Sequence, residues 1–206
     1  MNLRINKKKF IYLISPNKIY KNFYNKLNKV LKTGKVSFFQ LRLKKYSFKE
    51  KIFIGKKIKI ICKKNKVKFL INDDPFLAKK LKADGCHIGQ KDMPLKEARK
   101  IIGKKIIGVT CHNSLKLAQT AIKNGASYVA FGAFFSSKTK KTKYKASIKI
   151  INKIKKINKI PIVAIGGINS NNYKNLLLNN ANFLAISNYI WKNKKYEPFQ
   201  ALEKLK

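Results

Sequence analysis

Short apolar runs alternate with polar, helix-like segments along the whole chain. Eight of these runs have the length and composition of β-strands: residues 10–15, 36–42, 68–71, 85–88, 106–110, 128–131, 161–165 and 183–186. The segments between them carry helix-start signals, such as Ser47 with Glu50 as a capping box and Asp74 before Pro75. The chain therefore predicts strand and helix in strict alternation.

The strands have the pattern of a parallel sheet that is covered on both faces. Residues 162–165, Ile-Val-Ala-Ile, are continuously apolar instead of alternating. Eight β-α units favour a closed (β/α)₈ barrel, a TIM barrel, over an open doubly wound sheet. A length of 206 residues suits one domain, so residues 1–206 are expected to form a single catalytic barrel. The active site of such a barrel lies at the C-terminal ends of its strands.

The charge of the chain changes this picture little. A formal charge of +41 alone would suggest a nucleic-acid or membrane partner. The charge is almost all lysine, is spread along the chain and comes with no recognition-helix or zinc pattern, so a solvated surface explains it better. The three cysteines form no C-x-x-C pair, and no apolar run is long enough for a membrane span. We expect a cytoplasmic protein with no specific nucleic-acid or membrane partner, and a homo-oligomer is left open.

Three polar side chains follow one another at the end of the second strand. Period-two alternation points Gln40, Arg42 and Lys44 to the same side, toward the barrel mouth. An amide, a guanidinium and an ammonium around one cavity suit a diphosphate. The alternative is a strand that simply runs out into a basic surface loop.

Two aspartates follow the third and fourth strands. The chain has only eight acidic residues, and Asp74 is explained as a helix cap, which leaves Asp73 and Asp92 at the same rim. Paired carboxylates on a basic protein suit Mg²⁺, which takes its other oxygens from water and phosphate. Loop carboxylates bonded to backbone or lysine explain the spacing equally well. His87 and His112 have no second histidine at metal-ligand spacing.

A second anion site is expected at the ends of the last three strands. The loop after strand six, residues 136–142, carries hydroxyl and ammonium groups without an acid. Gly166 and Gly167 follow strand seven and Ser187 follows strand eight, where backbone N–H groups of a barrel commonly bind phosphate. A flexible basic loop is the alternative for residues 136–142. Two anion sites predict a pair of phosphorylated substrates.

Several motifs together resemble the thiamine phosphate synthase family. They are Gln-x-Arg-x-Lys in strand two, Ile-Asn-Asp, Ala-Asp-Gly-x-His-x-Gly-Gln-x-Asp, Ile-Ile-Gly-Val-Thr-x-His and Pro-Ile-Val-Ala-Ile-Gly-Gly-Ile, in the family order over residues 12–191. The resemblance implies a Mg²⁺-dependent transferase. Hydroxymethylpyrimidine diphosphate would lose pyrophosphate, and the nitrogen of a thiazole phosphate would attack the exposed methylene to give thiamine phosphate.

The resemblance also implies roles for individual residues. Asp73 and Asp92 match the Mg²⁺ ligands, and Arg42, Lys44 and Lys140 match the cations that would stabilise the departing pyrophosphate. The other matches are Gln40, Asn72 and Thr110, which with those cations hold the pyrimidine diphosphate, and Ser137, Thr139, Gly166, Ile186 and Ser187 around the thiazole phosphate. His87 falls on a motif position with no role implied. Ser136 and Ser137 stand where the family usually has Pro-Thr.

Three other functions compete with this one. A thiazole tautomerase-like isomerase on the same barrel would need a proton shuttle instead of Mg²⁺. Another phosphate-binding barrel enzyme would leave the diphosphate side of the site without a purpose. A basic nucleic-acid-binding protein is disfavoured, because the aromatic residues fall mostly within apolar runs.

Overall fold

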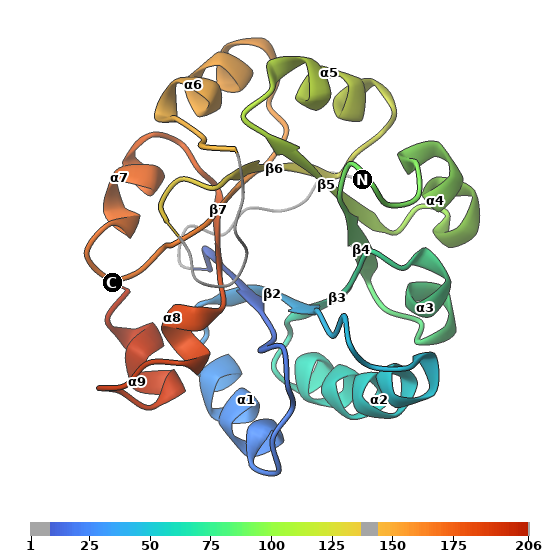
Figure 1. The fold of residues 1–206 in the computed structure, drawn as a ribbon, viewed down its shortest axis with the longest axis vertical. Coiled ribbons are helices and arrows are strands. Elements are labelled where there is room, and N and C mark those ends of the chain that lie inside the picture. Colours follow the sequence, from blue (N-terminus) through green and yellow to red (C-terminus); the bar gives the residue numbers. More distant parts are fainter. Residues whose placement is uncertain (1–8, 137–143, 206) are drawn as a thin grey trace.

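The strands close into a parallel barrel with helices on its outside (Figure 1). The computed structural model describes residues 9–136 and 144–205. Each strand pairs in parallel with the next, and the last pairs with the first. The strands are β1 (Ile11–Ile14), β2 (Val36–Leu41), β3 (Lys68–Asn72), β4 (Gly85–Ile88), β5 (Ile106–His112), β6 (Tyr128–Gly132), β7 (Ile162–Ile165) and β8 (Phe183–Ile186). The predicted TIM barrel is confirmed.

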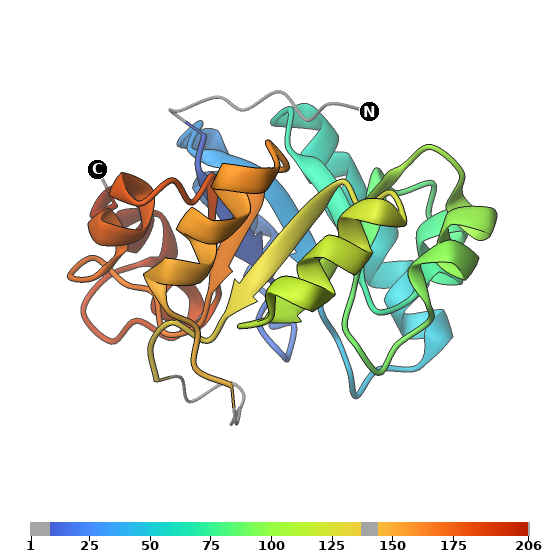
Figure 2. The ribbon, with the colours of Figure 1, turned by 90° about the horizontal axis from the view of Figure 1, so that it is seen from above.

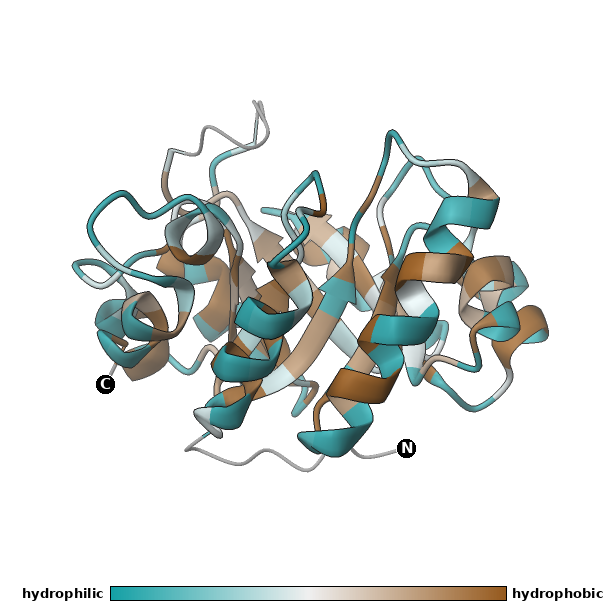
Figure 3. Ribbon diagram, turned by 90° about the horizontal axis from the view of Figure 1, so that it is seen from below, coloured by the Kyte–Doolittle hydropathy of each residue, from teal (hydrophilic) through white to brown (hydrophobic). Residues whose placement is uncertain are grey.

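Helices follow the strands around the ring. They are α1 (Phe23–Lys32), α2 (Phe48–Lys64), α3 (Pro75–Lys80), α4 (Leu95–Ile102), α5 (Leu115–Lys123), α6 (Ile148–Ile157), α7 (Tyr173–Leu178), α8 (Asn188–Trp191) and α9 (Pro198–Glu203). The helices turn their hydrophobic residues toward the strands and their hydrophilic residues outward (Figure 3). Within the described parts of the chain, no helix is long and apolar enough to cross a membrane.

The helix-start signals act as predicted. At α2, the Ser47 hydroxyl accepts the Glu50 N–H at 3.3 Å, and the Glu50 carboxylate accepts the Ser47 N–H at 2.7 Å. At α3, the Asp74 carboxylate accepts the Leu77 N–H at 2.9 Å, and Pro75 is the first helical residue. Asp74 is thus occupied as a cap.

Two separate apolar cores stabilise the barrel. The larger one lies between strands and helices, and the smaller one fills the barrel with side chains that include Tyr12, Phe38, Tyr128 and Phe183. Gly108 on β5 makes room for this filling, because a Cβ at that position would overlap the ring and hydroxyl of Tyr128. Side chains of the described residues therefore fill the barrel interior.

All strands point toward the same rim (Figure 2). The loops that follow them consequently gather at one end of the barrel, where parallel strands present their carboxyl ends. Each predicted site residue that the structure describes lies near the C-terminal end of a strand or in the loop that follows it, and so belongs to this rim.

Candidate active site

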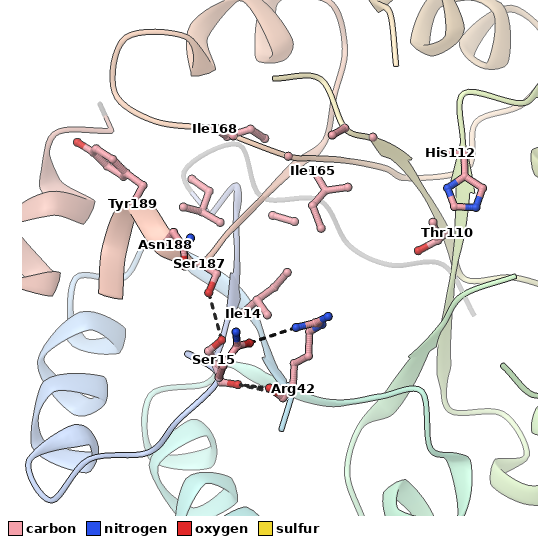
Figure 4. A pocket seen from close by; sticks show the side chains of 17 residues that line it. Ile14, Ser15, Arg42, Thr110, His112, Ile165, Ile168, Ser187, Asn188 and Tyr189 are labelled. Atoms are coloured by element: carbon pink, nitrogen blue, oxygen red, sulfur yellow. Dashed lines mark hydrogen bonds between the residues drawn. The ribbon is translucent and has the colours of Figure 1, made fainter. Parts of the chain in front are cut away.

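A cavity of about 190 Å³ opens at this rim (Figure 4). Its walls come mainly from β1, β5, β6, β7 and β8 and from the residues that follow these strands. Five of the predicted residues line it: Arg42, Thr110, Gly166, Ile186 and Ser187. The structure thus brings two residues expected to bind the pyrimidine diphosphate, Arg42 and Thr110, next to the residues expected to bind the thiazole phosphate.

Hydrogen bonds tie the ends of β1, β2 and β8 together beside Arg42. The Arg42 backbone N–H donates to the Ser15 hydroxyl at 2.9 Å, and its guanidinium donates to the Asn17 side-chain oxygen at 3.2 Å. The Ser187 hydroxyl donates to the Ser15 carbonyl at 3.1 Å (Figure 4). We did not predict Ser15 and Asn17 as site residues, although the polar Ser15-Pro16-Asn17 directly after an apolar strand is the signal that could have revealed them.

Two glycines let the loop after β6 pack on the end of β7. Gly166 and Gly167 have φ values of 106° and 63°, which side chains rarely allow. A Cβ on Gly166 would also overlap Ala133, and one on Gly167 would overlap the backbone of Ser136. The Phe135 N–H donates to the Gly166 carbonyl at 3.1 Å, which keeps the loop in this position. Gly166 and Gly167 therefore shape this wall of the cavity, because they let the loop after β6 pack closely, and they also leave their own backbone uncovered by side chains.

The two predicted metal ligands meet beside a lysine. Asp73 and Asp92 lie within hydrogen-bonding range of each other, and the Lys44 ammonium is 2.9 Å from the Asp73 carboxylate. The Gly89 N–H donates to one Asp92 carboxylate oxygen at 2.7 Å. The backbone of Asp73 has a φ of 64°, and its N–H donates to the His87 carbonyl at 2.8 Å. The ends of β3 and β4 therefore hold both carboxyl groups in place.

The pKa values of Asp73 and Asp92 are shifted in opposite directions. Burial favours a raised pKa for Asp73, but hydrogen bonds from Lys44 and Asp92 outweigh it, so the pKa of Asp73 is lowered. Burial and the neighbouring Asp73 carboxylate raise the pKa of Asp92, although the Gly89 N–H opposes this. Two carboxylates that compete for a proton suit a divalent cation, which could replace that proton. In the described part of the chain no third histidine, cysteine or acidic side chain joins a metal-binding group, so other ligands would be water or phosphate.

The amide side chains of Gln40 and Asn72 are both candidates to bind a polar ligand. Gln40 is only 2% exposed, and its side-chain nitrogen has no hydrogen-bond partner among the described residues. A buried donor without a partner is costly, so a ligand that accepts its hydrogen would be stabilised. Asn72 lines a second hollow of about 520 Å³ together with Lys44 and Asp73. Lys44 and Asn72 thus lie beside the carboxylate pair and outside the lining of the 190 Å³ cavity.

The two histidines have separate environments. His87 bonds to the hydroxyls of Tyr128 and Thr110 at 2.9 and 2.8 Å, as expected of a packed strand histidine. His112 lines the cavity and stacks on Tyr144 at a ring distance of 3.9 Å. The predicted residues Ser137, Thr139 and Lys140 lie outside the described residues.

Comparison with known proteins identifies the family. The model of the thiamine monophosphate synthase family matches residues 11–190. The chain belongs to this family. A thiamine-phosphate synthase from Pelagibacter ubique is 67% identical over 200 residues, which are 97% of each chain. One from Erythrobacter litoralis is 40% identical over 196 residues, or 93% of this chain and 92% of the relative.

A solved structure agrees with the sequence relatives. Thiamine phosphate pyrophosphorylase from Pyrococcus furiosus superposes with a TM-score of 0.85 at 29% identity, covering 97% of this chain and 94% of that one. As a thiamine-phosphate synthase, the chain is a transferase of thiamine biosynthesis. The synthase prediction is confirmed over the tautomerase-like and nucleic-acid-binding alternatives.

Proposed function

We propose that the rim binds Mg²⁺ and hydroxymethylpyrimidine diphosphate on the β2–β4 side and a thiazole phosphate on the β6–β8 side. The enzyme then joins the two heterocycles into thiamine phosphate and releases pyrophosphate. The observation that carries this proposal is the meeting of Asp73 and Asp92 beside Lys44, in a chain with only eight acidic residues. Such a pair has a clear purpose if it holds a cation that faces a diphosphate.

Asp73 and Asp92 are the proposed Mg²⁺ ligands. When bound, the ion would offset negative charge that develops on the departing pyrophosphate. Asp92 accepts the Gly89 N–H through one oxygen, which would leave its other oxygen for the ion, and Asp73 would hold the ion in place of the Lys44 ammonium. Lys44 is then available to the diphosphate itself, so metal and substrate would bind in a linked manner.

Three cations and two amides are proposed for the pyrimidine diphosphate. Arg42 is held by Ser15 and Asn17 with its guanidinium at the cavity, where it would form paired hydrogen bonds with phosphate oxygens. Lys44 and Lys140 are proposed to act with Arg42 as the catalytic cations. The Gln40 side-chain nitrogen, which has no partner among the described residues, and the Asn72 amide would bind polar atoms of the same substrate. Thr110 is proposed to contact its pyrimidine ring.

The thiazole phosphate is proposed to lie against the β7 and β8 ends. Gly166 exposes backbone there, and Ile186 and Ser187 line the same wall. Ser137 and Thr139 are proposed to supply hydroxyl groups to this phosphate, by the family resemblance alone.

This arrangement asks little of a general base. The aminopyrimidine ring can stabilise the methylene cation itself, so the protein has to stabilise the leaving group and orient the thiazole nitrogen. Arg42 and Lys44 serve the first task, and the walls around Gly166 and Ser187 serve the second.

We infer that the partners of this protein are its two substrates, with no specific nucleic acid or membrane and with a homo-oligomer left open. The three cysteines are free and buried, as in a reducing compartment, and we propose the cytoplasm.

Pyrophosphate release tests the proposal. Purified protein is given both heterocycles with and without Mg²⁺, beside Asp92→Ala and the control Glu203→Ala. Glu203 lies on α9, and its backbone carbonyl accepts from Lys35 just before the start of β2, at the end of the barrel opposite the rim. Thiamine phosphate should form only with Mg²⁺ and only when Asp92 is intact, while the control behaves as the wild type. An Asp92→Ala protein with unchanged rate and Mg²⁺ dependence would refute the metal assignment.

A further inference from the structure

Three hydroxyl groups and one imidazole form a row through the barrel interior up to the cavity. The hydroxyls of Tyr12 and Tyr128 are 2.8 Å apart, and that of Tyr128 is 2.9 Å from His87 Nδ1. His87 Nε2 is in turn 2.8 Å from the Thr110 hydroxyl. Thr110 lines the cavity, and its side chain points into it in Figure 4. The row therefore joins a buried tyrosine to a proposed substrate contact.

The two tyrosines at the inner end are locked in place. Tyr12 is 2% exposed and Tyr128 is fully buried among the side chains that fill the barrel. Tyr128 fits because β5 has Gly108 opposite its ring. Burial is the main cause that raises the pKa of both tyrosines, so both phenols keep their hydrogens at neutral pH.

The number of hydrogens limits how the row can be arranged. With a neutral histidine, each of the four groups carries one hydrogen that it can donate, and the row contains three hydrogen bonds. One of the four hydrogens therefore takes part in no bond within the row. It belongs to Tyr12, to Thr110, or to Tyr128 if Tyr128 accepts from both of its neighbours. At Tyr12 or Tyr128 it would be buried, since among the described residues the Tyr12 hydroxyl bonds only to Tyr128. A buried hydroxyl hydrogen without an acceptor is costly, whereas one at Thr110 faces the cavity.

We infer that the hydrogen bonds run one way, from Tyr12 through Tyr128 and His87 to Thr110, so that Thr110 donates its hydrogen to the substrate. His87 is then protonated on Nε2 and accepts at Nδ1. Thr110, already an acceptor toward His87, recognises an acceptor atom in the cavity. His87 is a positioning residue, because it acts on the substrate through Thr110.

The direction of the row sets what the site can distinguish. A 4-aminopyrimidine offers ring nitrogens as acceptors and an amino group as a donor, and Thr110 would bind a ring nitrogen. The backbone of Thr110 is held as well, because the Gln90 side-chain amide donates to its carbonyl. That the pyrimidine is the group beside Thr110 rests on the proposed function, whereas the direction of the row rests on the interior alone.

The tautomer of His87 in the wild-type protein tests the direction without any substrate. The chain has only two histidines, so long-range ¹H–¹⁵N spectra of ¹⁵N-labelled protein are simple, and a His87→Gln variant assigns the signals. We expect hydrogen on Nε2 and a bare Nδ1. A hydrogen on Nδ1 with a bare Nε2 would overturn the inference, because Thr110 would then donate inward.

Kinetics test the consequence for the substrate. Tyr128→Phe removes the hydrogen donated to His87, and Thr110→Val removes the final hydroxyl. Each should raise KM for the pyrimidine diphosphate about tenfold with kcat within about twofold, since a ground-state contact is lost. The double variant should be no worse than either single one. His87→Gln, whose amide can still donate to Thr110, should restore most of the affinity that His87→Leu loses.

The matched control is Tyr173→Phe, which removes the hydroxyl of a buried tyrosine on α7 and should leave both KM values unchanged. Additive effects of Tyr128→Phe and Thr110→Val, or an unchanged KM in Tyr128→Phe, would refute the coupling through His87. A rise confined to KM for the thiazole phosphate would instead refute the proposed placement of the pyrimidine and leave the direction of the row intact.

Discussion

Replacing Asp92 by asparagine should stabilise the metal-free protein and abolish its response to Mg²⁺. The asparagine oxygen can still accept the Gly89 N–H, which is 2.7 Å from Asp92 in the wild type. Its amide can donate to Asp73, so the contact between two carboxyl groups becomes an ordinary hydrogen bond. The change thus removes a metal ligand and a source of instability together.

The size of the gain follows from competing charges. Two like charges about 4 Å apart near a protein surface repel by about 4 kcal/mol before screening. The Lys44 ammonium, 2.9 Å from Asp73, and the partial exposure of the site offset most of this. We expect a net gain of about 1 kcal/mol, which raises Tm by about 2–4 °C for a domain of this size.

The gain should depend on pH. Because the pKa of Asp92 is raised, its contribution to stability is complete below its unfolded pKa and is lost as the pH rises through its folded pKa. The lowered pKa of Asp73 has the opposite effect, since its contribution is lost as the pH falls. The introduced asparagine side chain does not titrate, so the Tm advantage of the Asp92→Asn variant should grow as the pH rises from about 4, the ordinary aspartate pKa, through the raised folded pKa of Asp92.

Thermal unfolding with and without Mg²⁺ is the assay. The matched control is Asp84→Asn, because the Asp84 carboxylate pairs with Lys68 at 2.9 Å and accepts the Phe69 N–H at 2.9 Å. That variant should have a lower Tm and an unchanged response to Mg²⁺. The reasoning is wrong if Asp92→Asn lowers Tm, or if Mg²⁺ raises its Tm as much as that of the wild type.

Three further changes probe the barrel filling and the two sides of the site. Gly108→Ala should lower the free energy of unfolding in urea by about 1–3 kcal/mol, because the new Cβ overlaps Tyr128. Gly55→Ala should cost less, because the three atoms nearest to its new Cβ all belong to the flexible side chain of Leu81, and equal losses would contradict this. Gly166→Ala should raise KM for the thiazole phosphate about tenfold, because φ is 106° and Ala133 must move; an effect on the pyrimidine substrate alone would argue against the assignment. Arg42→Lys should lower kcat/KM by about tenfold to a hundredfold in pyrophosphate release, since lysine lacks the planar fork; an unchanged value would exclude paired phosphate contacts.

The sequence alone was sufficient to predict the order of the strands, the starts of the helices and the end of the barrel that carries the site. Strand burial and capping depend on neighbours within a few positions, as Ser47 with Glu50 shows. The meeting of Asp73 and Asp92 was also predictable, because they follow adjacent parallel strands whose carboxyl ends share one rim. The strand ends were less certain, and β5 continues to His112, beyond the predicted residue 110.

Only the tertiary structure decided which side chains meet across the barrel. Tyr12 and Tyr128 bond to each other although 116 positions separate them, and His87 reaches Thr110 on the neighbouring strand. Ser15 and Asn17 similarly reach Arg42 after closure of the barrel. These contacts depend on strand register and on how large side chains fill the interior, and neither quantity is written in the local pattern of apolar and polar residues.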